Sequence, residues 1–252
     1  MPRTAKLTNE PLYKRAETLI VERLVSGFWP AGARLPNEFD LAGELGVSQG
    51  TVRKALSALE RRGLLERTPG RGTIVVQTTE EEALYAFFRL RDARGRLVTP
   101  VPCIEILGQD RADEADMRHF GASVGNVATI SRVRENAGRR FAADYSRLPA
   151  PLVPGLEAQA PLPNSLYPFL SRTYGLTIMR VDESVTATLA DAALAGVLDC
   201  AAGTPLLEVS RLAYDLSGRC VERRRSHYLT EFVSYQVKLG RRGDFAAGAD
   251  GN

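Results

Sequence analysis

The chain has 252 residues, of which 44% are hydrophobic and 25% are charged, and this composition excludes wholesale disorder. No apolar run approaches the ~20 residues needed to cross a bilayer, and the first residues lack the apolar core of a secretion signal. The three cysteines are far apart and form no C-x-x-C pair, which argues against a zinc site or a disulfide scaffold. We therefore expect a cytoplasmic protein with no membrane partner, metal or cofactor.

The charges are divided unevenly along the chain. Residues 1–76 carry 12 basic and 8 acidic side chains, whereas residues 77–252 carry 21 basic and 22 acidic ones. The excess of positive charge in the first part favours a polyanionic partner there.

The first part of the chain predicts three helices. Apolar residues recur at helical spacing over residues 11–27 and again over residues 37–45, where Gly46 ends the second helix. A third helix begins after Ser48, a favourable N-cap residue. Its predicted buried face consists of Val52, Ala55, Leu56 and Leu59.

A β-hairpin follows the third helix in the sequence. Residues 64–67 and 73–76 flank a Pro/Gly-rich turn at residues 68–72, a pattern typical of two short antiparallel strands. Three helices followed by a hairpin predict a winged helix-turn-helix domain over residues 1–76.

The third helix is the predicted recognition helix, because one of its faces packs on the domain and the other can enter a major groove. Glutamine can read adenine and arginine can read guanine, while hydroxyl groups and helix N-terminal N–H groups bind phosphate. Arg71, at the tip of the turn, can reach the minor groove or the DNA backbone. The alternative is a solvated, structurally passive helix face. The candidate DNA-contacting residues are Arg34, Ser48, Gln49, Gly50, Thr51, Arg53, Lys54, Gly70, Arg71 and Gly72.

Several of these residues lie in motifs that resemble the DNA-binding domain of the GntR family over about residues 11–76. The motifs are Leu35-Pro36-Asn37-Glu38, Leu45-Gly46-Val47-Ser48, Thr51-Val52-Arg53-Lys54-Ala55-Leu56 and Gly70-Arg71-Gly72-Thr73. The chain departs from the family pattern at Gln49-Gly50 and at Phe39, two places that contact DNA in relatives. The resemblance therefore implies operator binding without implying a particular operator sequence.

The rest of the chain has a different organisation. Residues 77–83 are polar and acidic and predict a linker, residues 84–240 predict a second domain, and the Gly/Ala/Asp-rich residues 241–252 predict a disordered tail.

The second domain mixes strands and helices. Two similar stretches, at residues 130–139 and 209–219, each predict a strand, a tight glycine turn and another strand. Between them we expect a helix at residues 165–174, a strand at residues 179–187 and a short helix capped by Asp191. This order predicts an α+β fold.

Charged residues alternate along two of these strands. Period-two spacing places Arg132 and Arg134 on one face, and Asp144 can face them across the predicted hairpin. Two adjacent guanidinium groups suit a phosphate or a carboxylate, which arginine binds through forked donors. Residues 222, 224, 226 and 228 likewise share one face of the predicted last strand.

The second domain resembles the UTRA ligand-binding domain of the HutC subgroup, whose fold is similar to that of chorismate lyase, over about residues 84–238. The motifs that carry this resemblance are Ser131-Arg132-Val133-Arg134, Ser165-Leu166-Tyr167, Gly203-Thr204-Pro205-Leu206-Leu207, Gly218 and residues 221–228. Relatives often carry glutamate where this chain has Asp144, which is shorter by one methylene. The expected effector-contacting residues are Phe88, Arg89, Arg132, Arg134, Asp144, Ser165, Tyr167, Glu222, Arg224 and Tyr228.

The sequence therefore predicts a transcriptional repressor that binds double-stranded operator DNA as a homodimer, because one recognition helix offers too few base contacts. A small metabolite carrying a phosphate or a carboxylate would modulate that binding. Two alternatives remain open for the second domain, namely a lyase-like enzyme and an effector-free dimerisation domain. The charged residues can also form a purely structural ion-pair cluster.

Overall fold

The computed structural model describes residues 11–30, 32–68, 70, 72–76, 89–92, 94–98, 100–231 and 233–237. The predicted linker at residues 77–83, the predicted tail, Arg71 and Phe88 lie outside these residues. Within them, no helix has the length and apolar character needed to span a bilayer.

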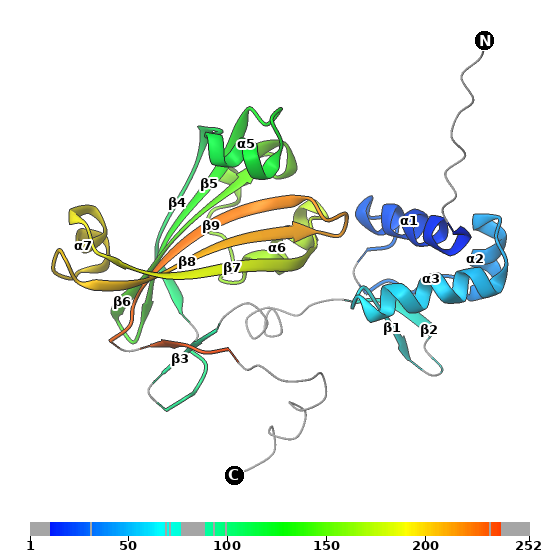
Figure 1. Ribbon diagram of the computed structural model, residues 1–252, viewed down its shortest axis with the longest axis horizontal. Coiled ribbons are helices and arrows are strands. Elements are labelled where there is room, and N and C mark those ends of the chain that lie inside the picture. The colour runs from blue at the N-terminus through cyan, green and yellow to red at the C-terminus, as the bar shows by residue number, and fades with distance from the viewer. Residues whose placement is uncertain are drawn as a thin grey trace.

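The N-terminal part is a three-helix domain with a two-stranded wing (Figure 1). Its elements are α1 (Leu12–Val25), α2 (Glu38–Leu45), α3 (Gln49–Arg61), β1 (Leu65–Thr68) and β2 (Gly72–Val75). The predicted helices and hairpin are therefore present, each with ends within a few residues of those expected.

Local capping explains where the helices of this domain begin and end. The Asn37 side chain accepts hydrogen bonds from the amides of Phe39 and Asp40 at the start of α2, and Gly46 ends that helix in the left-handed conformation. The Ser48 hydroxyl accepts a hydrogen bond from the Thr51 amide. These caps fix the short turn between α2 and α3 and with it the direction of the recognition helix.

The C-terminal part is built on one antiparallel sheet in the strand order β4-β5-β6-β9-β8-β7. The strands are β4 (Val101–Arg111), β5 (Asn126–Asn136), β6 (Arg139–Pro149), β7 (Ile178–Leu189), β8 (Pro205–Asp215) and β9 (Cys220–Leu229). The helical segments are α5 (Glu114–Phe120), η1 (Ala150–Leu152), η2 (Leu156–Gln159), α6 (Leu166–Tyr174) and α7 (Ala192–Leu198). The two predicted hairpins are β5–β6 and β8–β9, and the Asp191 side chain caps α7.

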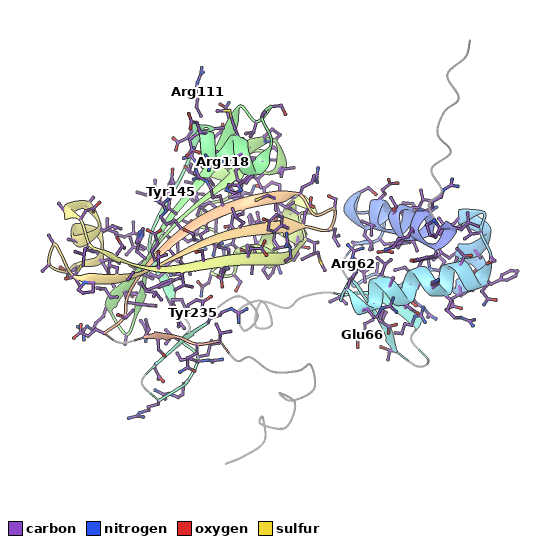
Figure 2. The ribbon with its side chains drawn as sticks, viewed as in Figure 1. Arg62, Glu66, Arg111, Arg118, Tyr145 and Tyr235 are labelled. Carbon is purple, nitrogen blue, oxygen red and sulfur yellow. The ribbon has the colours of Figure 1, made fainter. Side chains whose placement is uncertain are left out.

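The two faces of this sheet have different surroundings. The inner face packs against α6, where Leu170 is fully buried beside Ile130 and Val221. The outer face is an open groove bordered by α5 and α7. Figure 2 shows Tyr145 and Tyr235 on opposite sides of the sheet.

A second small sheet lies across one end of the inner face. The strands β3 (Leu90–Arg91) and β10 (Ser234–Tyr235) pair antiparallel, and the Gln236 amide donates to the Arg89 carbonyl at 2.8 Å. We call residues 89–91 and 233–236 the strap. Because β10 follows β9, the expectation that β9 is the last strand was wrong.

The turn between β8 and β9 contacts the winged helix domain. Leu216 is buried in the hydrophobic core that α1, α2 and α3 form. The Arg62 guanidinium donates to the Leu216 carbonyl at 3.3 Å and also pairs with the buried Glu17 at 2.8 Å. The end of the large sheet therefore packs against the winged helix domain.

Candidate functional site: an exposed recognition helix and a buried arginine site

The α3 helix has the two faces expected of a recognition helix. Its buried residues are Val52, Ala55, Leu56 and Leu59, as the sequence predicts. Gln49, Gly50, Arg53 and Lys54 are exposed on the other side. The Ser48 hydroxyl caps the helix and lies 2.8 Å from the Thr51 hydroxyl, so the two hydroxyl groups form one polar group at the helix start.

Two of the exposed basic residues have partners within the domain. The Arg53 Nε pairs with a Glu38 carboxylate oxygen at 2.9 Å, although the Arg53 side chain is 61% exposed. The Lys54 ammonium lies 4.2 Å from the centre of the Tyr13 ring. Exposed contacts of this kind contribute little to stability. Both side chains therefore remain available to another partner at small cost.

The wing lies close to Arg34, the remaining DNA-contacting candidate. Gly72 has a positive φ of 84°, and a Cβ atom at this position would lie 3.0 Å from the Arg34 Nε. The positive φ therefore favours glycine here, and any larger residue would also displace the end of the Arg34 side chain. Gly70 is also at positive φ, whereas Arg71 lies outside the described residues.

On the inner face of the sheet, Arg132 and Arg134 are both buried, as the alternation predicts. The Arg134 Nε donates to Asp144 at 2.5 Å across the β5–β6 hairpin, so the expected pairing is confirmed. The Arg132 Nε donates to Glu105 at 2.6 Å. The remaining Arg132 donors contact the carbonyls of residues 163 and 164, so Arg132 positions the segment that leads into α6.

Tyr167 connects two further arginines. Its hydroxyl donates to the buried Glu222 at 2.7 Å, and the Arg211 guanidinium donates to that hydroxyl at 3.4 Å. Glu222 in turn pairs with Arg224 at 2.6 Å, and the Arg224 guanidinium also donates to Ser146 at 2.9 Å. Tyr167 is thus part of the polar site as well as of the core beneath α6.

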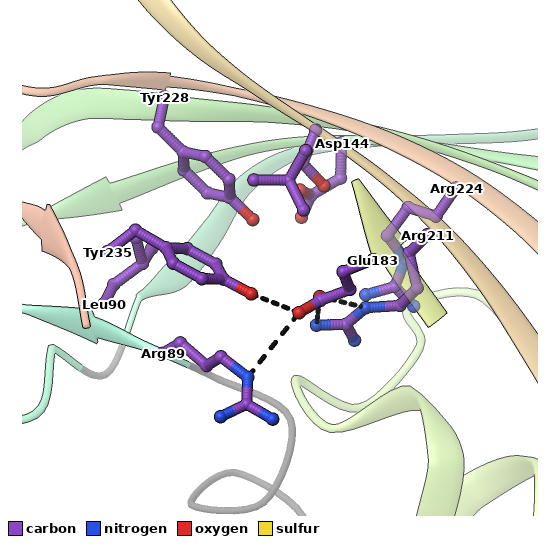
Figure 3. Close-up of a pocket in the computed structure, with 10 residues that line it drawn as sticks. Arg89, Leu90, Asp144, Glu183, Arg211, Arg224, Tyr228 and Tyr235 are labelled. Atoms are coloured by element: carbon purple, nitrogen blue, oxygen red, sulfur yellow. Dashed lines mark hydrogen bonds and ion pairs between the residues drawn. The ribbon is translucent and has the colours of Figure 1, made fainter. Parts of the chain in front are cut away.

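A small cavity of about 10 Å³ lies beside Arg211 and Arg224 (Figure 3). Four of the predicted residues line it, namely Arg89, Asp144, Arg224 and Tyr228. Ser165 is buried at the start of α6 and does not line this cavity. Phe88 lies outside the described residues. The structure therefore brings four of the ten expected residues to this cavity. Arg132, Arg134, Tyr167 and Glu222 lie on the same face of the sheet but do not line the cavity.

Sequence reasoning missed six of the ten residues that line the cavity, and three of these six are charged or phenolic. Arg211 on β8, Glu183 on β7 and Tyr235 in the strap all line it. Glu183 and Arg211 lie directly opposite each other on adjacent strands and pair at 2.5 Å. Both residues lie in segments that the sequence predicts as strands. Their pairing depends on the register between these two distant segments, which the sequence does not show.

The electrostatics of the site keep its acids charged and its phenols neutral. Burial raises the pKa of Glu222, but Arg224 and the Tyr167 hydroxyl hold it below its ordinary value. Burial also raises the pKa of Asp144, and Arg134 and Arg224 outweigh that effect. Burial and the adjacent carboxylate raise the pKa of Tyr167 to about 12 and that of Tyr228 to about 12. At neutral pH the tyrosines therefore donate hydrogen bonds and the carboxylates accept them.

The described residues contain no group of three or more His, Cys, Asp or Glu side chains arranged to hold a metal ion. The hydrogen-bond donors that line the cavity include the guanidinium groups of three arginines and the phenol groups of two tyrosines. Such groups bind oxyanions. The arrangement suits recognition of a small polar anion.

The comparisons with known proteins identify both parts of the chain. Residues 12–75 match the family described as "Bacterial regulatory proteins, gntR family", and residues 105–233 match the UTRA domain. The chain belongs to the GntR family of regulators with a UTRA domain. The predictions of this family, of an α+β fold and of a DNA-binding transcriptional regulator are therefore confirmed.

Individual relatives agree with this assignment. The chain is 31% identical to the HTH-type transcriptional regulator SmoD of Agrobacterium fabrum, over 69% of this chain and 73% of that protein. It is 37% identical to the histidine utilization repressor of Pseudomonas aeruginosa, over 43% of this chain and 46% of that protein. The crystal structure of PhnF from Mycobacterium smegmatis superposes with a TM-score of 0.53 at 26% identity, covering 90% of this chain and all of that one. The relatives are described as regulators and repressors, and this family binds operator DNA and small-molecule effectors.

Proposed function

We propose that this GntR-family regulator is a repressor that binds its operator as a homodimer and responds to a small anionic metabolite. The observation that carries the proposal is the convergence of three arginines and two tyrosines on one cavity, in a chain whose recognition helix is exposed. The name of the histidine utilization repressor supports the repressor assignment.

The recognition helix reads the operator through its first two turns. Gln49 and Arg53 face outward and have the donors that read adenine and guanine in the major groove. The N-terminal amides of α3, with the hydroxyls of Ser48 and Thr51, are placed to hold a phosphate. Lys54 contributes charge to the same face.

We expect Arg53→Ala to weaken operator binding by about 1–3 kcal/mol and to relax the base preference at one position, because a bidentate contact to guanine is lost. The measurement is fluorescence anisotropy on an operator selected from genomic fragments at fixed salt. Arg61→Ala, at the opposite end of the same helix, is the matched control. Equal affinities for the two variants would remove Arg53 from the base-reading set.

The effector site binds an anion that also carries hydroxyl or amine groups. Among the described cavity residues, Arg89, Arg211 and Arg224 supply positive charge, while Asp144 and the Tyr228 hydroxyl bind neutral or cationic polar groups. The ligand changes operator affinity only to the extent that it binds the DNA-competent and DNA-incompetent forms unequally.

We expect a thermal-shift screen of phosphorylated and carboxylated metabolites to yield a hit. A ligand at a hundred times its dissociation constant adds about 2.7 kcal/mol to folding stability, which raises the midpoint by roughly 2–4 °C in a chain of this size. The hit is then added to the operator complex, where we expect the affinity to change, and is recovered chemically unchanged.

Two tyrosine variants control this screen. Tyr228→Phe removes a hydroxyl that lines the cavity and is expected to reduce the shift. Tyr145→Phe changes the outer face and is expected to preserve it. A panel without any hit, or a hit that leaves operator binding unchanged, would contradict the sensor proposal, and turnover of the hit would favour the enzyme alternative.

The homodimer forms through the outer face of the large sheet. This face carries an open groove of about 1110 Å³, and apolar side chains that are normally buried lie exposed there, including Ile104 and Ile106. A second copy related by two-fold symmetry would cover the same patch on both chains. Two half-sites on DNA require such a pair of recognition helices.

We expect the protein to sediment as a dimer and Ile106→Glu to sediment as a monomer, because a charge would be buried at the centre of the interface. Ile106 is 64% exposed, and Leu189, which is 63% exposed, lies on the opposite face of the sheet by strand alternation. Leu189→Glu is therefore the matched control and should remain dimeric. A monomeric wild-type protein at micromolar concentration with operator present, or a dimeric Ile106→Glu variant, would rule out this interface.

A further inference from the structure

The hydrophobic core of the winged helix domain includes a buried residue from the second domain. Leu216, in the turn between β8 and β9, is 7% exposed and belongs to the same cluster as Ile20, Leu59 and Leu64. Met179, in β7, packs against that cluster and is partly buried. The other buried members of the cluster that the structure describes lie within residues 16–65. The second domain therefore completes a core that is otherwise built within the first.

The β8–β9 turn is built to hold Leu216 in place. The buried Asp215 carboxylate accepts from the amides of Ser217 at 2.9 Å and Arg219 at 3.0 Å, and Gly218 turns the chain at a φ of 80°. Residues 217–219 are exposed, so Leu216 is the buried residue at the tip of this hairpin. A side chain that is presented on a fixed turn loses little conformational freedom when it docks.

Arg62, the C-cap residue of α3, adds a polar contact beside Leu216. Its guanidinium donates to the Leu216 carbonyl at 3.3 Å and to the buried Glu17 of α1 at 2.8 Å. Lys14 pairs with the other Glu17 oxygen at 3.0 Å. Arg62 therefore joins α1, the end of α3 and the β8–β9 turn. Figure 2 shows it on the side of the winged helix domain that faces the large sheet.

This contact lies at the opposite end of α3 from the residues proposed to read DNA. The helix runs for 13 residues from Gln49 to Arg61, so its first residue lies about 20 Å from the docked end. Gln49 and Arg53 are exposed in its first two turns. DNA can therefore bind while Leu216 is docked, and a rotation about the docked end is amplified at the residues that read the operator.

The contact is small for an interface between domains. Among the described residues, Leu216 is the buried side chain that the second domain contributes to the winged helix core, whereas interfaces that hold domains rigidly together are large and hydrophobic. Each domain also has its own hydrophobic cluster. The contact can therefore form and break while both domains stay folded.

We propose that Leu216 is a positioning residue for operator binding, because its docking in the winged helix core sets the orientation of α3 relative to the large sheet. In a dimer of docked chains the two recognition helices keep a fixed separation. Binding of one helix to its half-site then presents the other helix to the second half-site at a high effective concentration. The inference rests on the homodimer proposed above and adds the contact that fixes the spacing of its DNA-binding domains.

The test measures the affinity of the full-length protein for its operator and for one half-site of that operator, by fluorescence anisotropy at fixed salt. Leu216→Ala removes the docked side chain, so we expect binding to the whole operator to weaken about tenfold because the helices are no longer oriented in advance. Binding to the half-site should be unchanged, since the first turns of α3 are intact. Leu216→Met keeps the volume of the side chain and should restore tight binding.

Ser217→Ala is the matched control, because Ser217 lies in the same turn but is exposed. This variant should bind both DNAs like the wild-type protein. Equal weakening of Leu216→Ala on both DNAs would show a merely structural role in the core. Unchanged or tighter binding to the whole operator would show that docking does not position the helices. Either result overturns the proposal.

Methyl NMR of the wild-type protein tests the docking without DNA and without a variant. We expect nuclear Overhauser effects between the Leu216 methyl groups and methyl groups of the winged helix core, and their absence overturns the proposal. Wild-type protein that binds the whole operator no more tightly than a half-site would contradict the homodimer and, with it, the positioning role. A failure confined to the Leu216 variants would overturn the positioning role and leave the homodimer standing.

Discussion

The structure of the second domain depends on pairing every buried arginine of the inner sheet face with a carboxylate. A guanidinium taken out of water costs several kcal/mol unless its charge and its donors are matched. The strands supply the partner in each case, from the adjacent strand or from two residues away. The pairs are Arg132–Glu105, Arg134–Asp144, Arg211–Glu183 and Arg224–Glu222. Because these pairs match one another's charges and donors, the inner face can hold buried arginines without a bound ligand.

The same strands connect this site to the DNA-binding domain. The β8–β9 hairpin carries Arg211, Glu222 and Arg224 along its length, and its turn places Leu216 in the core of the winged helix domain. Asp215 makes the turn rigid, since its carboxylate accepts from the amides of residues 217 and 219 and pairs with Arg219 at 2.7 Å. The strap gives a second connection through Arg89. The ion pairs of the sheet are therefore connected to the winged helix domain in two ways. One is the packing of Leu216 in its core, and the other is the chain that precedes Arg89.

The sequence was informative where the relevant interactions are local. Asn37, Gly46 and Ser48 mark helix ends by chemistry that acts within four residues, and the buried face of α3 follows from helical spacing. The face shared by Arg132 and Arg134 follows from strand alternation. These features could be predicted before any tertiary contact was known.

The sequence was less informative where distant strands determine the environment. In β4 the usual pattern is reversed, because Glu105 points inward to Arg132 while Ile104 and Ile106 are exposed on the outer face, so hydrophobic alternation gives no warning of a polar inner residue. The strap strands have two residues each, which is too short for any periodicity. Glu183 contacts Arg211 only because β7 pairs with β8, and it contacts Arg89 and Tyr235 only because the strap lies against β7.

The pairing of the buried arginines in the ligand-free protein can be measured directly by NMR of the arginine Nε–H groups. Resonances are assigned by single Arg→Lys variants, and hydrogen exchange is followed at neutral pH without added oxyanions. The account predicts resolved, slowly exchanging Nε–H signals for Arg132, Arg134, Arg211 and Arg224. Fast exchange of all four signals in the ligand-free protein would mean that the arginines are solvated and unpaired, and would contradict the central claim.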